Sequence, residues 1–303
     1  MDSVFLTVLN MSLTAAFVIA AILLARFALR RSRAPKLISY LLWAVVLFNL
    51  LCPFKLESVF SLMPRHLPAV SEEMAYGVHA PAISIPLGSQ GPENSVNSVP
   101  VATSVEIPVG LLLSYVWLAG VAAMLVYGMV AYLRLKRRVA LAVRVEGNIY
   151  ESDRIDAPFV LGWTSPRIYL PAGIDLPQYG HIIAHERTHI KRRDPLVATV
   201  AFFALALHWF NPLVWAAYYL MLRDMESSCD EAVLRGAGAD IRCAYSSALL
   251  SVANSRRGLP IPLAFGEQSV KDRVKNVLNF KRPSKMIIVA AVVLTFGLTW
   301  GFA

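Results

Sequence analysis

The chain has 303 residues, of which 56% are hydrophobic and only 16% are charged, and its mean hydropathy is +0.54. This composition is typical of a membrane protein and excludes an ordinary soluble domain. The formal net charge of +9 would suit a nucleic-acid-binding protein, but the basic residues cluster beside apolar stretches, where a membrane protein needs them. We therefore expect the lipid bilayer as a partner and no direct binding of nucleic acid.

Four apolar stretches are long enough to cross a bilayer as helices, at about 1.5 Å of rise per residue. They cover residues 4–25, 37–54, 109–133 and 286–303. The first is not a cleavable signal peptide, because Asp2 precedes it and its basic residues follow it. We expect three spans within residues 1–133, a domain at residues 134–285 and a fourth span at residues 286–303.

The distribution of basic residues predicts how these spans are oriented. Lysines and arginines follow the first and third spans and precede the fourth, whereas the loop at residues 55–108 holds only Lys55 and Arg65. Cytoplasmic loops carry the excess of basic residues. We therefore expect the N-terminus and residues 55–108 outside the cell, and residues 134–285 in the cytoplasm.

Residues 185–189 read H-E-x-x-H in a segment that suits a helix. Two histidines four positions apart share one helical face, so His185 and His189 can bind one zinc ion. Glu186 lies next to the first ligand, where its carboxylate can take a proton from water at the metal. The motif predicts a zinc hydrolase with Glu186 as general base. The alternative is a chance match on a basic helix.

Residues 143–170 have the pattern of a small sheet. Alternation at its start and a short apolar run at residues 148–150 are followed by two further runs, residues 159–161 and 167–170, on either side of a turn. In zinc peptidases an edge strand near the metal commonly holds the substrate as an added strand. The alternative is that these strands only support the zinc helix.

A catalytic zinc site needs a third protein ligand and one open position. His181 shares the face of His185, but three histidines along one straight helix span about 12 Å, too far to converge on one ion. His208 lies inside an apolar run, where an interfacial or supporting role is expected. The best candidate is Glu226, with Asp230 on the same helical face to accept a hydrogen bond from a ligand imidazole. The alternative is a solvated acidic helix start.

Residues 196–222 form an apolar run with no acidic or basic residue except His208. As one straight helix this run would be about 40 Å long and would put Glu226 on the far side of the membrane from His185. Pro212 cannot continue a helix, and Asn211 before it favours a turn. We predict a helical hairpin that dips into the membrane or lies along its face. A fifth full span is the alternative, and it would break the pattern of basic residues.

Together these motifs resemble those of the BlaR/MecR-type membrane metallopeptidases, gluzincins that act as signal-transducing antirepressors. The resemblance is carried by H-E-x-x-H-I-K-R-R-D at residues 185–194, H-W-F-N-P-L-V-W at 208–215, E-x-x-C-D-E-A-V at 226–233 and P-F-V-L-G-W-T-S-P-R-I-Y-L-P at 158–171. It implies that His185, His189 and Glu226 bind one catalytic zinc ion and that Glu186 is the general base.

The resemblance also implies a mainly α membrane protein in the bacterial plasma membrane. Its four transmembrane helices would carry a cytoplasmic α+β zinc protease domain of the gluzincin type, with the hairpin as a re-entrant or interfacial element. Substrates in this family are a cytoplasmic transcriptional repressor and the protease's own chain. Residues 255–270, rich in glycine and proline, are the most loop-like stretch of the domain and a candidate site of self-cleavage, with an ordinary linker as the alternative. A homodimer is left open.

One feature of the family is missing from this sequence. The β-lactam receptors of the family carry an extracellular penicillin-binding sensor after the last span, whereas this chain ends at Ala303 and contains no S-x-x-K acylation motif. We therefore do not expect β-lactam sensing from this chain itself.

Two rival functions remain at this point. One is a housekeeping zinc protease that degrades damaged membrane proteins, and the other is a non-catalytic signalling scaffold, against which the intact Glu186 argues. Candidates for stabilising the oxyanion are Tyr218, Tyr219, Tyr245 and Arg223.

Overall fold

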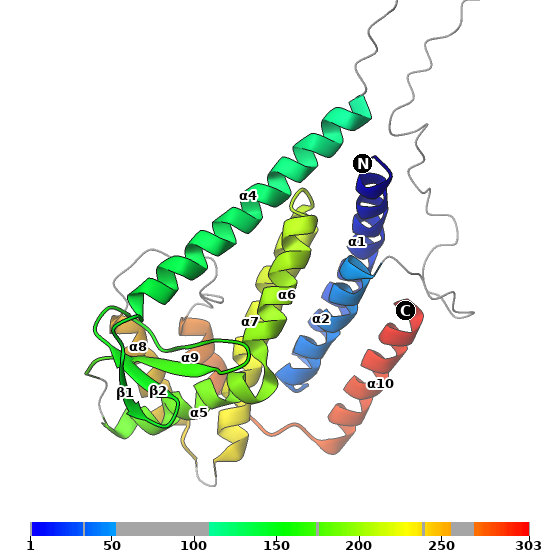
Figure 1. Cartoon of the computed structure of the whole chain (residues 1–303). Coiled ribbons are helices and arrows are strands. Elements are labelled where there is room, and N and C mark those ends of the chain that lie inside the picture. The colour runs from blue at the N-terminus through cyan, green and yellow to red at the C-terminus, as the bar shows by residue number, and fades with distance from the viewer. Residues whose placement is uncertain are drawn as a thin grey trace, which may run out of the picture.

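The computed structural model describes residues 2–32, 34–52, 109–173, 176–237, 240–255 and 270–302, and within them the chain is mainly helical with one small sheet (Figure 1). The outer loop expected at residues 55–108 lies outside the described residues. So does nearly all of the candidate self-cleavage segment at residues 255–270.

Helices α1 (Asp2–Arg31) and α4 (Val109–Arg138) are the two in the described part of the chain that are long and apolar enough to cross a membrane. Helix α2 (Lys36–Leu51) and most of α10 (Lys285–Phe302) are apolar but shorter. Helix α4 continues past residue 133, where we expected its span to end, because the straight-chain basic residues that follow favour helix. It thereby leads directly from the apolar region to the sheet.

Rows of exposed apolar side chains run along α4 and α10. Val126 and Met129 on α4 are about as exposed as Val289 and Phe296 on α10, at 62%, 59%, 62% and 68%. Soluble proteins rarely leave apolar surface of this extent in water, whereas lipid covers it at no cost. The protein is therefore a helical, membrane-associated protein.

The apolar run at residues 196–222 turns back on itself. Helix α6 (Asp194–Leu207) ends at His208, and α7 (Pro212–Gly236) begins with its proline at the first helical position, where the missing N–H costs nothing. The Asn211 side chain caps α7 by accepting from the backbone N–H of Leu213 at 2.9 Å. Helices α6 and α7 therefore stand side by side, as Figure 1 shows.

The turn between α6 and α7 is tied to the first two helices. Asn211 Nδ2 donates to Ser12 Oγ on α1 at 2.8 Å, and His208 Nε2 lies 3.0 Å from the carbonyl oxygen of Leu50 on α2. The largest apolar core lies between α1, α2, α6 and α7, with a contribution from α10. The hairpin is therefore part of the helical bundle.

Near one end of this core lies a buried ion pair. Arg26 on α1 donates to both carboxylate oxygens of Asp224 on α7, at 2.5 and 2.7 Å, and Trp43 Nε1 on α2 donates to the same carboxylate at 3.0 Å. The carboxylate of Asp224 thus joins α1, α2 and α7, and it lies two residues before Glu226 in the sequence. A charge so deeply buried is tolerated only when it is paired and hydrogen-bonded.

The sheet lies at the end of the bundle where α4 finishes (Figure 1). Its strands are β1 (Val143–Glu146), β2 (Ile149–Ser152), β3 (Phe159–Leu161) and β4 (Arg167–Pro171), in the order β1-β2-β4-β3. The β2–β4 pair is parallel and the other two pairs are antiparallel. The sheet therefore has β1 and β3 at its edges.

Helix α5 (Leu176–Arg192) packs against the sheet. Ile182 and Ile183 on α5 share a core with Ile168 and Leu170 on β4. Helices α8 (Arg242–Ser255) and α9 (Val270–Leu278) complete this part of the molecule, and α8 packs on α5. The sheet and α8 therefore fix α5 beside α7.

We expect Asp224→Ala to lower the free energy of unfolding by about 3–5 kcal/mol, because it leaves the Arg26 guanidinium buried without a partner. The double variant Arg26→Met/Asp224→Leu should regain much of this loss, since it removes both charges. Chemical unfolding in detergent micelles, followed by circular dichroism, measures both. A double variant no more stable than Asp224→Ala would contradict this account.

Candidate metal centre

Helices α5 and α7 bring together three side chains that could hold a metal ion. His185 and His189 lie one turn apart on α5 and face Glu226 on α7. The Nε2 atoms of the two histidines are 3.1 Å apart, and they lie 3.3 and 3.5 Å from the oxygens of Glu226. The candidate ligand atoms of all three residues are within 4.8 Å of one another, and no residue of the three is more than 9% exposed.

The outer nitrogen of each imidazole is held by a hydrogen bond. His189 Nδ1 lies 2.8 Å from Asp194 Oδ2, and His185 Nδ1 lies 2.9 Å from the hydroxyl of Tyr245 and 3.3 Å from Asp230. Such bonds turn the Nε2 atoms inward and fix the tautomer that can bind a metal. Two imidazoles and one carboxylate form a donor set that suits zinc and leaves a fourth position open. The residues therefore fit the implied ion.

Arg273 on α9 supports the acidic side of this cluster. Its guanidinium donates to both oxygens of Asp230, at 3.0 and 2.7 Å, and lies 3.4 Å from Glu226 Oε2. Burial would raise the pKa of Glu226, but Arg273 and His185 lower that pKa to about 2. Burial acts on Asp230 in the same sense, and the same two partners hold its pKa well below the usual range. Both carboxylates therefore stay ionised at neutral pH.

Glu186 is buried beside the ligands. Burial raises its pKa, and the two neighbouring histidines only partly oppose this rise. A carboxylate with a raised pKa takes up a proton more readily, which is the property that a general base requires. Position and pKa therefore suit the expected role of Glu186.

Two residues of this cluster were missed by sequence reasoning. Asp194 ends the stretch H-E-x-x-H-I-K-R-R-D, so its place five residues after His189 was a signal that we did not use. Arg273 lies 43 positions beyond Asp230, in a short helix. Its distance along the chain from the H-E-x-x-H motif corresponds to no known ligand spacing. Only the packing of α9 reveals its role.

His181, His208 and Cys229 lie beside the cluster or away from it. His181 contacts the Tyr245 ring edge-on at 6.3 Å, and His208 lies at the turn between α6 and α7. Cys229 Sγ is 3.5 Å from His189 Nδ1, which Asp194 already holds. Burial raises the pKa of the Cys229 thiol, so it remains protonated and packs as a small side chain.

Four residues were candidates for stabilising an oxyanion. Of these, Tyr245 is the one that contacts a candidate metal ligand, through the 2.9 Å contact between its hydroxyl and His185 Nδ1. Its hydroxyl donates its proton to Asp230 at 2.7 Å, and its oxygen can accept from His185 Nδ1, so the proton is not available to an oxyanion. Arg223 pairs with Asp272 at 2.5 Å. Tyr218 packs against the apolar core of the bundle, and Tyr219 is 49% exposed. Arg273, which we did not consider, is the cation beside the ligands.

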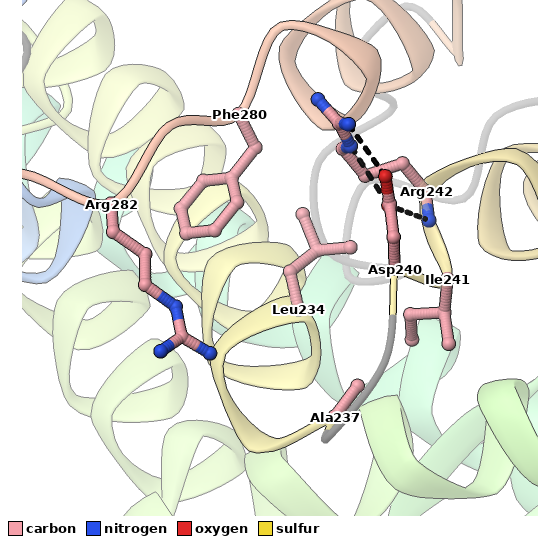
Figure 2. A pocket seen from close by; sticks show the side chains of 7 residues that line it. All are labelled: Leu234, Ala237, Asp240, Ile241, Arg242, Phe280 and Arg282. Atoms are coloured by element: carbon pink, nitrogen blue, oxygen red, sulfur yellow. Dashed lines mark hydrogen bonds and ion pairs between the residues drawn. The ribbon is translucent and has the colours of Figure 1, made fainter.

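A separate pocket of about 350 Å³ lies where α7 ends (Figure 2). Its lining residues are Leu234, Ala237, Asp240, Ile241, Arg242, Phe280 and Arg282. Asp240 and Arg242 pair with each other at 2.6 Å, and no residue of the metal cluster lines the pocket. The pocket is therefore distinct from the metal centre.

We expect the purified protein to contain one zinc ion per chain, and Glu226→Ala to weaken zinc binding by at least about 10-fold. Glu231→Gln is the matched control. Glu231 lies on the same helix, but its carboxylate contacts Arg235 and the backbone N–H of Lys36. Metal analysis and chelator competition measure the affinities. Full zinc binding by Glu226→Ala would remove this ligand assignment.

The metal-free protein should lose stability as the pH rises from about 6.5 to about 9. Burial lowers the pKa of His185, but the hydrogen bonds to Asp230 and Glu226 outweigh this effect and raise the pKa from 6.5 to about 9. A folded-state pKa above the unfolded value gives stabilisation that is complete below pH 6.5 and disappears as the pH passes 9.

Melting temperatures of the metal-free protein across this pH range test the expectation. His185→Gln should flatten the profile between pH 6.5 and 9. Zinc affinity should rise over the same interval, because the metal displaces the proton. A wild-type profile as flat as that of His185→Gln would contradict the assignment.

The sequence matches a known family over most of its length. The family described as BlaR1 peptidase M56 matches residues 6–277. The chain is 30% identical over 158 residues to "Regulatory protein BlaR1" of Bacillus licheniformis, which is 50% of this chain and 26% of that protein. It is 27% identical over 164 residues to "Methicillin resistance mecR1 protein" of Staphylococcus aureus, 50% of this chain and 28% of that protein. The match thus spans about a quarter of the length of these relatives.

Proposed function

Because the chain belongs to the BlaR1 peptidase M56 family, we propose that it is a membrane zinc endopeptidase that transduces an external signal by cleaving a cytoplasmic transcriptional repressor, its own chain, or both. The observation that carries this proposal is the convergence of His185, His189 and Glu226, with the outer nitrogen of each imidazole held by a buried partner. A site that only supported the fold would not need three inward-facing metal ligands.

The proposed reaction is hydrolysis of a peptide bond. Bound to the three ligands, zinc would acidify a water molecule and polarise the scissile carbonyl. Glu186 takes the proton from the water and returns it to the leaving amine. Asp194 and Asp230 hold the imidazoles in place, and Arg273 offers positive charge beside the site where the oxyanion develops.

We further propose that the substrate binds as an added strand at the edge strand β3. This strand forms one edge of the sheet and packs beside α5, the helix that carries both histidines. Backbone hydrogen bonds along an edge hold an extended peptide without much demand on its sequence. The sheet would then both support the zinc helix and align the substrate.

The names of the relatives support a regulatory role. One is a regulatory protein and another is connected with methicillin resistance. We propose that this chain regulates an antibiotic-resistance or related response, that its N-terminus lies outside the cell and that the peptidase domain lies in the cytoplasm. Residues 255–270 are the proposed place of self-cleavage.

Glu186→Ala should abolish cleavage and keep the metal. Loss of a general base costs about 10²–10⁴-fold in rate, whereas zinc content should stay that of the wild type. Comparing the new protein N-termini in cells that express either form identifies the substrates. The matched control is Glu146→Ala, an exposed position on β1. If Glu186→Ala cells signal normally, the scaffold function replaces this proposal. Products from many unrelated membrane proteins would instead favour the housekeeping protease.

Cys243 offers a test of the orientation. It is exposed on α8, whereas Cys229 is buried. In a Cys52→Ser background, a membrane-impermeant maleimide should label Cys243 in inverted vesicles and leave it unlabelled in intact cells. The double variant Cys52→Ser/Cys243→Ser measures the labelling that does not come from Cys243. Labelling in intact cells would place the domain outside.

A further inference from the structure

Three turns of helix α2 each carry a hydrogen bond to a carboxylate of the α6–α7 hairpin. The pairs are the Lys36 backbone N–H with Glu231 Oε2 at 3.0 Å, the Tyr40 hydroxyl with Asp194 Oδ1 at 3.1 Å, and Trp43 Nε1 with Asp224 Oδ2 at 3.0 Å. The Tyr40 and Trp43 side chains lie on one helical face, and the Lys36 N–H is a free donor at the start of the same helix. The first turns of an apolar helix are therefore bonded to the acidic end of the hairpin.

The middle bond of the three reaches the metal centre. Asp194 is 1% exposed and divides its two oxygens between two partners. Oδ2 lies 2.8 Å from His189 Nδ1, and Oδ1 accepts the hydroxyl of Tyr40. The path from an apolar helix to a proposed zinc ligand therefore consists of two hydrogen bonds and one carboxylate.

The other groups around Asp194 do not replace the phenol. Arg192 Nε lies 3.4 Å from Oδ1, but it makes no hydrogen bond there, and its guanidinium stacks over the Tyr40 ring at 4.8 Å. The Cys229 thiol lies 3.4 Å from Oδ2, on the side of His189. Among the residues that the structure describes, Tyr40 is thus the hydrogen-bond donor that fixes Oδ1. Without the phenol, Oδ1 keeps only the longer ion pair with Arg192, so the orientation of the carboxylate is held less firmly.

We propose that Tyr40 is a positioning residue of the metal centre, which holds His189 in its ligand orientation through Asp194. The inference rests on the proposed function, since it takes His189 to be a metal ligand. Sliding α2 by the rise of one residue, about 1.5 Å, is enough to break the bond between Tyr40 and Asp194. The position of α2 relative to the hairpin therefore affects the metal affinity.

Tyr40→Phe in the full chain tests this role, because it removes only the hydroxyl. We expect zinc affinity, measured by chelator competition in detergent, to fall about 3- to 10-fold, because direct partners of metal ligands contribute about 10- to 100-fold and Tyr40 acts one hydrogen bond further from the ligand. The visible absorption bands of the Co²⁺-loaded protein should shift, since they report the ligand field. Tyr218→Phe is the matched control, as its buried hydroxyl has no hydrogen-bond partner among the described residues, and it should leave both readouts unchanged.

A double-mutant cycle shows whether the effect passes through Asp194. Tyr40→Phe added to Asp194→Asn should cost less than twofold further affinity, because the carboxylate that Tyr40 positions is already altered. The inference is overturned if Tyr40→Phe lowers the melting temperature but leaves zinc affinity and the Co²⁺ bands unchanged. Tyr40 would then have only a structural role. The same full effect in the Asp194→Asn background would also overturn the inference. If the wild type binds no zinc, the proposed function itself fails.

Discussion

The reversal of the chain between α6 and α7 is the constraint on which the rest of the structure depends. An apolar run of this length would otherwise continue as one helix and carry Glu226 away from the histidines. Pro212 removes the N–H that such a helix would need, and Asn211 supplies the cap for the helix that starts there. Because α7 then runs without interruption to Gly236, its acidic residues return to α5.

Helix α7 carries several carboxylates that are buried in the protein interior. Asp224, Glu226 and Asp230 are all buried, and each is paired. Their partners come from different elements, since Arg26 lies on α1 and Arg273 on α9. Burying ionised groups is costly unless partners compensate, so these pairs also determine where the surrounding helices can sit. The same contacts that stabilise the bundle therefore shape the metal centre.

Connecting a metal ligand to an apolar helix has a physical logic for a signalling peptidase. A ligand imidazole keeps its orientation only while its outer partner stays in place. If that partner is itself held by a helix in the apolar region, motion of the helix changes the site without any change in the ligands. The bonds of Tyr40, Asp194 and His189 provide such a connection.

Much of the architecture and the family were readable from the sequence. The family expected from the motifs is confirmed, as are the helical, membrane-associated character and the small sheet. These features depend on local patterns, namely apolar length, alternation and the placement of proline. The bounds of the helices differed, because a helix such as α4 extends beyond the apolar segment that we used to predict it.

The metal-ligand candidates His185, His189 and Glu226 came from the sequence, because a spacing of four on a helix and a known motif restrict the choice. The partners Arg273 and Tyr40 did not, since Arg273 of α9 bonds Asp230 of α7 across 43 positions and Tyr40 of α2 bonds Asp194 of α6 across 154 positions. No local pattern encodes which side chains such helices bring together. The sequence by itself thus determined the chemical identity of the candidate site. Only the tertiary packing decided which groups orient its ligands, because a buried carboxylate takes whichever donor the neighbouring helix presents.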